Sequence, residues 1–138
     1  RVGGRFAAID YAMGSARCEP PIPLFAEAIS WICDAFAAAG ASPTIGARLG
    51  LILEDAGLSD ATTLGVQGYL PPRSPDGPAL VVGVLHTLAD AIVSHGIASR
   101  EQMGLDTLQQ RMADALTRDN AVLLPPTLVG AWGKQSST

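Results

Sequence analysis

The spacing of apolar residues along the chain predicts strands and helices in alternation. Residues 6–10 form a short apolar run after two glycines, which is the pattern of a buried strand. A loop over 12–22 follows. From residue 23 to 40 apolar residues recur every three or four positions, as in an amphipathic helix. Pro23 suits the first turn of that helix, and Gly40 is a typical residue just beyond its end.

The next segments continue this alternation. A second helix is predicted over 42–57, because Pro43 suits its first turn and Gly57 its end. Apolar residues then alternate with small and polar ones, which predicts a strand over 61–69. The stretch "PPRSPDGP" that follows reads as a proline-rich loop.

The last third of the chain predicts two more helices and a strand. Residues 80–95 are strongly apolar and are followed by Gly96, so they form the third predicted helix. Ser99 and Gln102 have the spacing of a capping box at the start of a fourth. Residues 127–133 form the final predicted strand, in which we expect Trp132 to belong to the core.

The hydrophobic content of the chain bears on whether it has a binding partner. The chain has 138 residues, enough for a single domain spanning 1–138. It is 48% hydrophobic with a mean hydropathy of +0.27, which indicates either an alanine-rich helical protein or extra apolar surface that meets a partner. The longest apolar stretch, "ALVVGVLHTLADAIV", is interrupted by polar residues. It is predicted to be too short and too polar to span a bilayer.

Charge and cysteine content narrow the class of partner. The net charge is −4, Lys134 is the only lysine, and the arginines are scattered along the chain. No basic stripe is predicted, so nucleic acid is not an expected partner. Cys18 and Cys33 match no metal-binding spacing and are expected to be free thiols, which predicts a cytoplasmic protein.

Three segments, in order, carry a resemblance to a known family. "GGRFAAID", "RLGLILEDAGLSDATTLGV" and "LVGAWGK" resemble the fifth, sixth and seventh strand regions of class I S-adenosylmethionine-dependent methyltransferases. Within that family the chain is most similar to small-molecule enzymes of the ubiquinone and menaquinone biosynthesis group. Val2 departs from the pattern, since the family usually has proline in that turn.

The resemblance implies a fold class. It is α/β, or α+β for the segment alone: a small mixed three-stranded sheet with four helices, the C-terminal part of a Rossmann-like methyltransferase fold. The final strand is expected between the other two and antiparallel to them. Residues 12–41 and 71–122 are insertions relative to the minimal family fold, and their helices are expected to form a lid over a small-molecule methyl acceptor.

The cofactor is expected to bind elsewhere. In the family a glycine-rich loop after the first strand and an acidic residue ending the second hold S-adenosylmethionine, and neither is present in this sequence. The resemblance therefore places both upstream of Arg1. S-adenosylmethionine is the expected cofactor of the whole enzyme, and this chain alone is not expected to bind it.

Five residues are candidates for the substrate site. Asp10 and Tyr11 end the first strand, and ligands of open α/β sheets bind beyond the carboxyl ends of strands. Glu19 is the acid of the following loop, and Trp31 has a ring suited to stacking on a planar acceptor. His86 is a candidate base for an acceptor hydroxyl. Each also has a plain structural reading: a turn cap, a solvated charge, helix packing or an ordinary helix histidine.

Two functions follow. The first is the substrate-binding and lid portion of a methyltransferase. The second is a non-enzymatic binding or dimerisation module that keeps a degenerate half of the fold. An unrelated α+β domain is a third reading. In the family fold the strand over 6–10 pairs with a further strand that this chain lacks, so a homo-oligomer or pairing with a missing N-terminal half is expected. The alternative is that the helices fold back and cover this edge within one chain.

Overall fold

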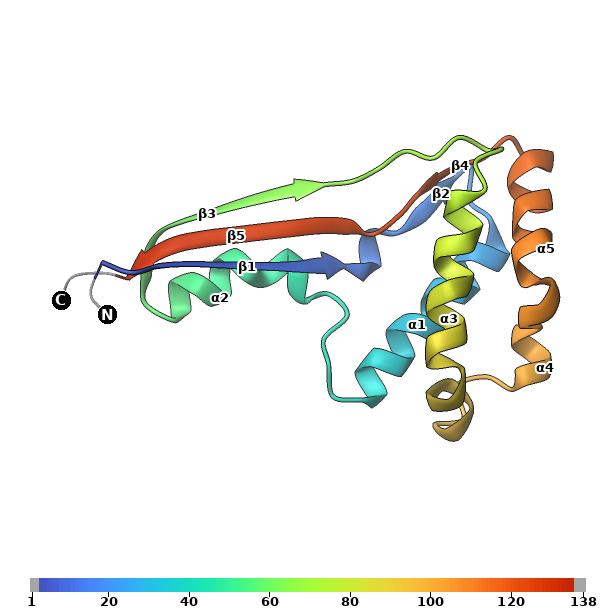
Figure 1. Cartoon of the computed structure of the whole chain (residues 1–138), viewed down its shortest axis with the longest axis horizontal. Coiled ribbons are helices and arrows are strands. Elements are labelled where there is room, and N and C mark those ends of the chain that lie inside the picture. Colours follow the sequence, from blue (N-terminus) through green and yellow to red (C-terminus); the bar gives the residue numbers. More distant parts are fainter. Residues whose placement is uncertain (1–2, 136–138) are drawn as a thin grey trace.

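The computed structural model describes residues 3–135, in which a long sheet projects from a helical lobe (Figure 1). Arg1 and Val2, part of the turn that carries the family resemblance, lie outside the described residues, as do residues 136–138. The elements in chain order are β1 (Arg5–Ala12), η1 (Met13–Ser15), β2 (Arg17–Glu19), α1 (Pro23–Ala38), η2 (Ile45–Arg48), α2 (Leu49–Asp55), β3 (Leu58–Val66), α3 (Asp76–Ser94), α4 (Arg100–Met103), α5 (Leu105–Arg118), β4 (Val122–Leu124) and β5 (Thr127–Gln135).

The main sheet has the predicted strand order. β5 lies between β1 and β3 and runs antiparallel to both, with Tyr11 opposite Leu128 and Val66 opposite the same leucine. The expectation of a mixed sheet is wrong for the described residues, because every hydrogen-bonded pair is antiparallel. β1 and β3 are parallel to each other without touching, so their carboxyl ends lie at the same end of the sheet, beside the helical lobe (Figure 1).

A second, small sheet was not predicted. β2 pairs antiparallel with β4, and Leu70 adds a bridge to Leu123. The segment 12–22, expected to be a loop, therefore contains both η1 and β2. Three-residue strands are too short to show a period of two, so the sequence carries no signal for them. Cys18 and Leu123 are buried where these strands meet the helical lobe.

Two helices differ from their predicted form. The predicted helix over 42–57 is shorter and is divided into η2 and α2, and Gly46 of η2 packs directly against the backbone of β1. α3 begins at Asp76, so the end of the expected proline-rich loop is helical. The Ser99–Gln102 capping box is confirmed, although Gly104, with φ +53°, then separates α4 from α5.

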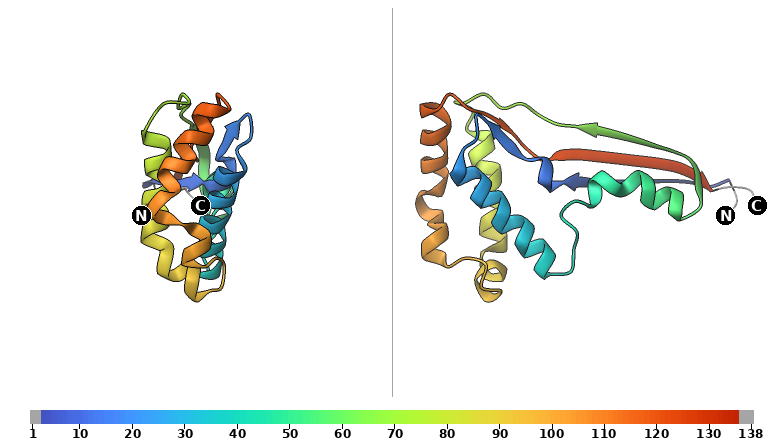
Figure 2. Two further views of the ribbon diagram at one scale, coloured as in Figure 1. Left: turned by 90° about the vertical axis from the view of Figure 1, so that its right-hand side faces the viewer. Right: turned by 180° about the vertical axis from the view of Figure 1, so that it is seen from behind.

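The two faces of the main sheet are covered unequally. Ala12, Val129 and Ala131 pack against Leu49 and Leu53 of α2. Because side chains alternate along a strand, the other residues point to the opposite face, which no described helix covers along most of its length (Figures 1 and 2). We call this the open face; its residues are Arg5, Ala7, Ile9, Tyr11, Thr62, Leu64, Val66, Leu128, Gly130, Trp132 and Lys134.

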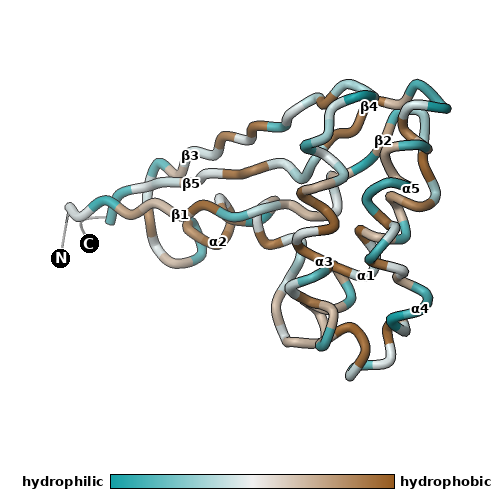
Figure 3. Tube along the Cα trace, turned by 45° about the vertical axis from the view of Figure 1, so that its right-hand side comes forward, coloured by the Kyte–Doolittle hydropathy of each residue, from teal (hydrophilic) through white to brown (hydrophobic). Residues whose placement is uncertain are grey.

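Trp132 corrects a prediction. It was expected in the core, but its position on the open face leaves it 44% exposed. The larger core lies instead in the helical lobe, where α1, α3 and α5 pack around Phe25, Leu85 and Met112. Figure 3, which colours the chain by hydropathy, shows apolar segments within these helices.

Within the described residues, α3 is a helix long and apolar enough to cross a membrane, judged by length and composition alone. This corrects the expectation for this stretch, because the helix extends to Asp76 and reaches a mean hydropathy of 1.5. Its apolar residues also have a packing role, since Leu85 and Ile92 are completely buried in the lobe. Taken alone, the helix is weak evidence for a membrane span.

Candidate functional site: an apolar pocket between sheet and helical lobe

A pocket of about 520 Å³ lies where the open face meets the helical lobe. The sheet contributes the carboxyl ends of β1 and β3 and the start of β5, while α1 and α3 form the opposite walls. The pocket is therefore at the end of the sheet to which both parallel strands point. Its lining residues are Tyr11, Met13, Ile29, Ile32, Phe36, Val66, Gly68, Leu80, Val81, Val84, Pro125, Pro126 and Leu128.

The backbone around Tyr11 is fixed from behind. Gly46 of η2 packs so closely on β1 that a Cβ atom there would lie 2.5 Å from the Tyr11 carbonyl carbon. Only glycine tolerates this approach without a shift of the backbone. η2 thus supports the strand end on the α2 side, while the Tyr11 side chain projects on the open face into the pocket.

A polar network ties the three strand ends together. The Ser15 hydroxyl donates to the Ala12 carbonyl at 2.7 Å and accepts from the Thr127 amide at 2.8 Å. Gln67 Nε2 donates to the carbonyls of Ser15 and Pro125, at 3.0 and 2.9 Å. These partly buried bonds join the segment after β1, the segment after β3 and the start of β5. They hold the sheet side of the pocket in one arrangement.

The helical walls follow from residue spacing. Ile29, Ile32 and Phe36 lie on one face of α1, and Leu80 and Val84 are one turn apart on α3. All of these except the exposed Leu80 also pack the core of the lobe. The pocket thus lies at the edge of the helical core, at a place that the sheet does not cover.

The lining allows one kind of ligand. The Tyr11 hydroxyl is the polar side-chain group among the lining residues, and no charged residue lines the pocket. Ligand pockets of this size are mostly apolar with a few polar groups that set orientation. The arrangement fits a small, uncharged, mainly apolar molecule that makes one hydrogen bond to Tyr11.

The structure gives the predicted site residues different surroundings. Tyr11 lines the pocket, whereas the Asp10 carboxylate accepts a hydrogen bond from the Tyr11 amide at 2.7 Å and lies on the other face of β1. Glu19 is exposed in β2, and Trp31 is buried in the lobe. His86 is exposed and lines a separate polar hollow that also contains the Asp90–Arg100 ion pair.

Sequence reasoning missed most of the residues that form the site. Ser15 and Gln67 carry no periodic or motif signal, since their role depends on strand ends far apart in the sequence. The apolar lining of α1 and α3 was predicted, but only as helix packing. The double proline at 125–126, which the sequence marked as a break, forms part of the pocket wall.

Both cysteines are free thiols with raised pKa values. Burial raises the pKa of Cys18 from 9.0 to about 12. The pKa of Cys33 is raised by burial and by the neighbouring charge of Asp34. Thiols of this kind remain protonated near neutral pH and are poor nucleophiles. Neither lines the pocket, so we assign neither a catalytic role.

The raised pKa of Cys18 predicts that the folded chain loses stability at alkaline pH. Between pH 9 and 12 the unfolded chain releases this proton while the folded chain keeps it, so the free energy of unfolding falls as pH rises. Urea unfolding at several pH values above 8 is expected to show a shallower decline for Cys18→Ala than for the wild type. Cys33→Ala is the control and is expected to change the slope less. Equal slopes for wild type and Cys18→Ala would contradict the prediction.

Among residues 3–135, no group of three or more His, Cys, Asp or Glu side chains is placed to hold a metal ion. Comparison with protein-family models and with curated protein sequences finds no match to this chain.

Proposed function

We propose that this chain forms the methyl-acceptor-binding and lid portion of an S-adenosylmethionine-dependent methyltransferase acting on a small molecule. The observation that carries the proposal is the apolar pocket at the carboxyl ends of β1 and β3. Two further features support it. β5 lies between its neighbours in the order that the resemblance predicted, and the segments 12–41 and 71–122 supply the helices around the pocket.

The described residues do not fit the cofactor itself. S-adenosylmethionine carries an ammonium, a carboxylate and ribose hydroxyls, and the pocket lining has no charged side chain to pair with them. The proposal therefore assigns the cofactor to protein segments outside this sequence. Free thiols fit a reducing compartment, so we propose the cytoplasm as the place of action.

The residues of this chain would have three tasks. The apolar walls would bind the acceptor, the Tyr11 hydroxyl would orient it, and the helices would exclude water. The proposal gives no step to His86, because His86 lines a different hollow. Methyl transfer depends mainly on alignment, so such a site does not require a strong base.

A non-enzymatic binding or dimerisation module is the second candidate. The observation that favours it is the open face, whose apolar side chains are exposed outside the pocket as well as inside it. Reading the gene upstream of the Arg1 codon separates the two candidates. The first predicts an encoded glycine-rich turn between a strand and a helix. A start codon directly before Arg1 would contradict it.

Cofactor titration tests the same proposal in solution. Calorimetric titration of this chain with S-adenosylmethionine is expected to give no binding heat, since the pocket offers the cofactor no charged partner. The same titration with a protein extended upstream to include the glycine-rich turn is the control and is expected to show binding. Micromolar binding to the present chain would contradict the assignment of the cofactor to other segments.

A further inference from the structure

The open face exposes a continuous apolar surface beyond the pocket. Ile9 is 70% exposed, Leu64 59% and Val66 64%. Register places Ile9 and Leu64 on either side of Gly130, and Ala7 and Thr62 on either side of Trp132. The apolar side chains thus lie in adjacent rows on the same side of three strands. Apolar patches of this extent, unlike scattered apolar residues, mark interaction surfaces.

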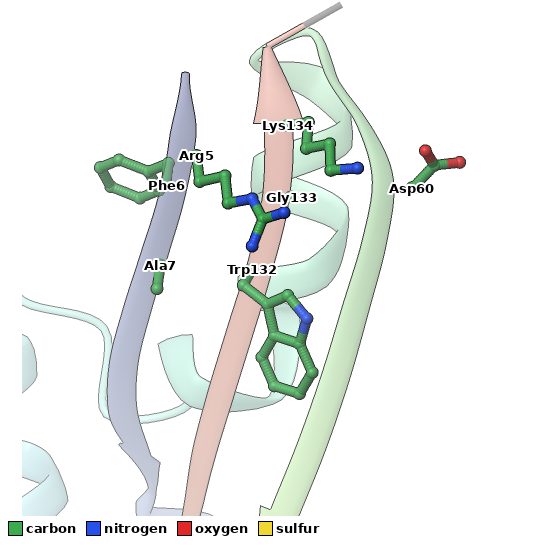
Figure 4. Close-up of a pocket in the computed structure, with 7 residues that line it drawn as sticks. All are labelled: Arg5, Phe6, Ala7, Asp60, Trp132, Gly133 and Lys134. Atoms are coloured by element: carbon green, nitrogen blue, oxygen red, sulfur yellow. The ribbon is translucent and has the colours of Figure 1, made fainter. Parts of the chain in front are cut away.

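The charged residues of the open face are Arg5 and Lys134, and Asp60 of β3 lines the same hollow as both. Arg5 and Lys134 lie directly opposite each other on β1 and β5, which is an unfavourable pairing for like charges. Figure 4 shows the Arg5 side chain reaching across β5 beside Trp132, and the Lys134 side chain extending toward the β3 side, where the Asp60 carboxylate points outward. Neither cation forms an ion pair with any residue of the described range 3–135. The far end of the open face therefore has two cations that share a hollow with Asp60 but are not paired with it.

We propose that the open face binds an amphipathic helix of a partner segment, with its apolar stripe along the strands and an acidic side chain at one end against Arg5 and Lys134. Three strands about 4.8 Å apart span about 10 Å, which one helix covers. From the Tyr11 row to the Arg5 row is about 20 Å, or roughly 13 helical residues. The helix would also form an outer wall for the pocket.

The charge pair decides against a second copy of the chain as the occupant. If two copies pack face to face with their strands running the same way, Arg5 and Lys134 of both copies meet as four cations. If the strands run in opposite directions, the cations of each copy lie on the apolar Tyr11–Leu128–Val66 row of the other, which carries no acid. A partner with an acidic residue avoids both costs. This inference stands apart from the proposed methyltransferase function.

Designed peptides test the charge requirement. Two 18-residue helical peptides would share one leucine stripe, and one would end in two glutamates where the other ends in two lysines. Binding would be followed by the fluorescence of exposed Trp132, with Trp132→Phe to subtract the signal of buried Trp31. At low salt the glutamate peptide is expected to bind at least tenfold more tightly than the lysine peptide. In the double variant Arg5→Gln, Lys134→Gln this preference is expected to vanish.

Two results would overturn the proposal. One is equal binding, or no binding, of the two peptides to the wild-type chain. The other is a dimer in sedimentation that Ile9→Asp dissociates and that exposed Val93→Asp on α3 leaves intact, since this would make a second copy the occupant. Ile9 and Val93 are both exposed, so neither variant removes a core contact, and circular dichroism would check that both remain folded.

Discussion

Replacing Gly46 with alanine is expected to lower the free energy of unfolding by about 1–3 kcal/mol, the usual cost of overpacking. An added Cβ would lie 2.5 Å from the Tyr11 carbonyl carbon, 2.7 Å from its oxygen and 2.8 Å from the Ala12 amide nitrogen. These are backbone atoms of a paired strand, so they cannot rotate away as a side chain can. Urea unfolding monitored by circular dichroism measures the effect.

Gly83 provides the matched control. It lies inside α3, and a Cβ there would meet no atom within 4 Å. Alanine is a better helix former than glycine, so Gly83→Ala is expected to raise the free energy of unfolding by about 0.5–1 kcal/mol. The same substitution should thus have opposite signs at the two sites. A loss of stability below about 0.5 kcal/mol for Gly46→Ala would show that η2 does not hold the end of β1 rigidly.

The pocket predicts a large change in ligand binding. The uncharged fluorescent probe N-phenyl-1-naphthylamine is expected to bind the wild-type chain, because the lining is apolar and uncharged. Val84→Trp places an indole in the pocket and is expected to weaken probe binding at least tenfold. A fluorescence titration at constant protein concentration gives the dissociation constants.

A second tryptophan on the same helix is the control for this experiment. Val93→Trp makes the same substitution at an exposed position of α3 outside the pocket lining, so probe affinity is expected to be unchanged. Leu80→Trp, at an exposed position one turn before Val84, fills the pocket from its edge if Val84→Trp destabilises the lobe. Unchanged affinity in both pocket variants would show that the probe binds elsewhere.

The sequence predicted the main sheet better than the site. The strands near 6–10, 61–69 and 127–133 and their order are confirmed, because each has a clear apolar pattern or family-like segment. β2 and β4 were not predicted, because strands of three residues show no periodicity. Trp132 was assigned to the core because an aromatic residue in a strand is usually buried, and pattern alone does not say which face of a sheet lacks a cover.

The site itself depends on contacts that no local pattern records. Tyr11 was predicted as a site residue from its place at a strand end, and in the structure it lines the pocket. The hydrogen bonds of Ser15 and Gln67 join residues 52 and 112 positions apart, so only the folded chain reveals them. His86 and Trp31 were selected for the chemistry of their side chains, which does not report whether a residue faces the pocket.

The position of β5 in the sheet has a consequence for how the protein folds. β1 and β3 do not touch each other, and the strand that joins them is the last described element of the chain. During synthesis the helical lobe can therefore begin to pack while β1 and β3 are still unpaired, because residues 127–135, which pair with both, are made later. Pairings across such long sequence separations form slowly, so the sheet should be the last part to acquire its native contacts. Until then two apolar strands are exposed to aggregation, and that exposure ends when the nine residues of β5 pair with both of them.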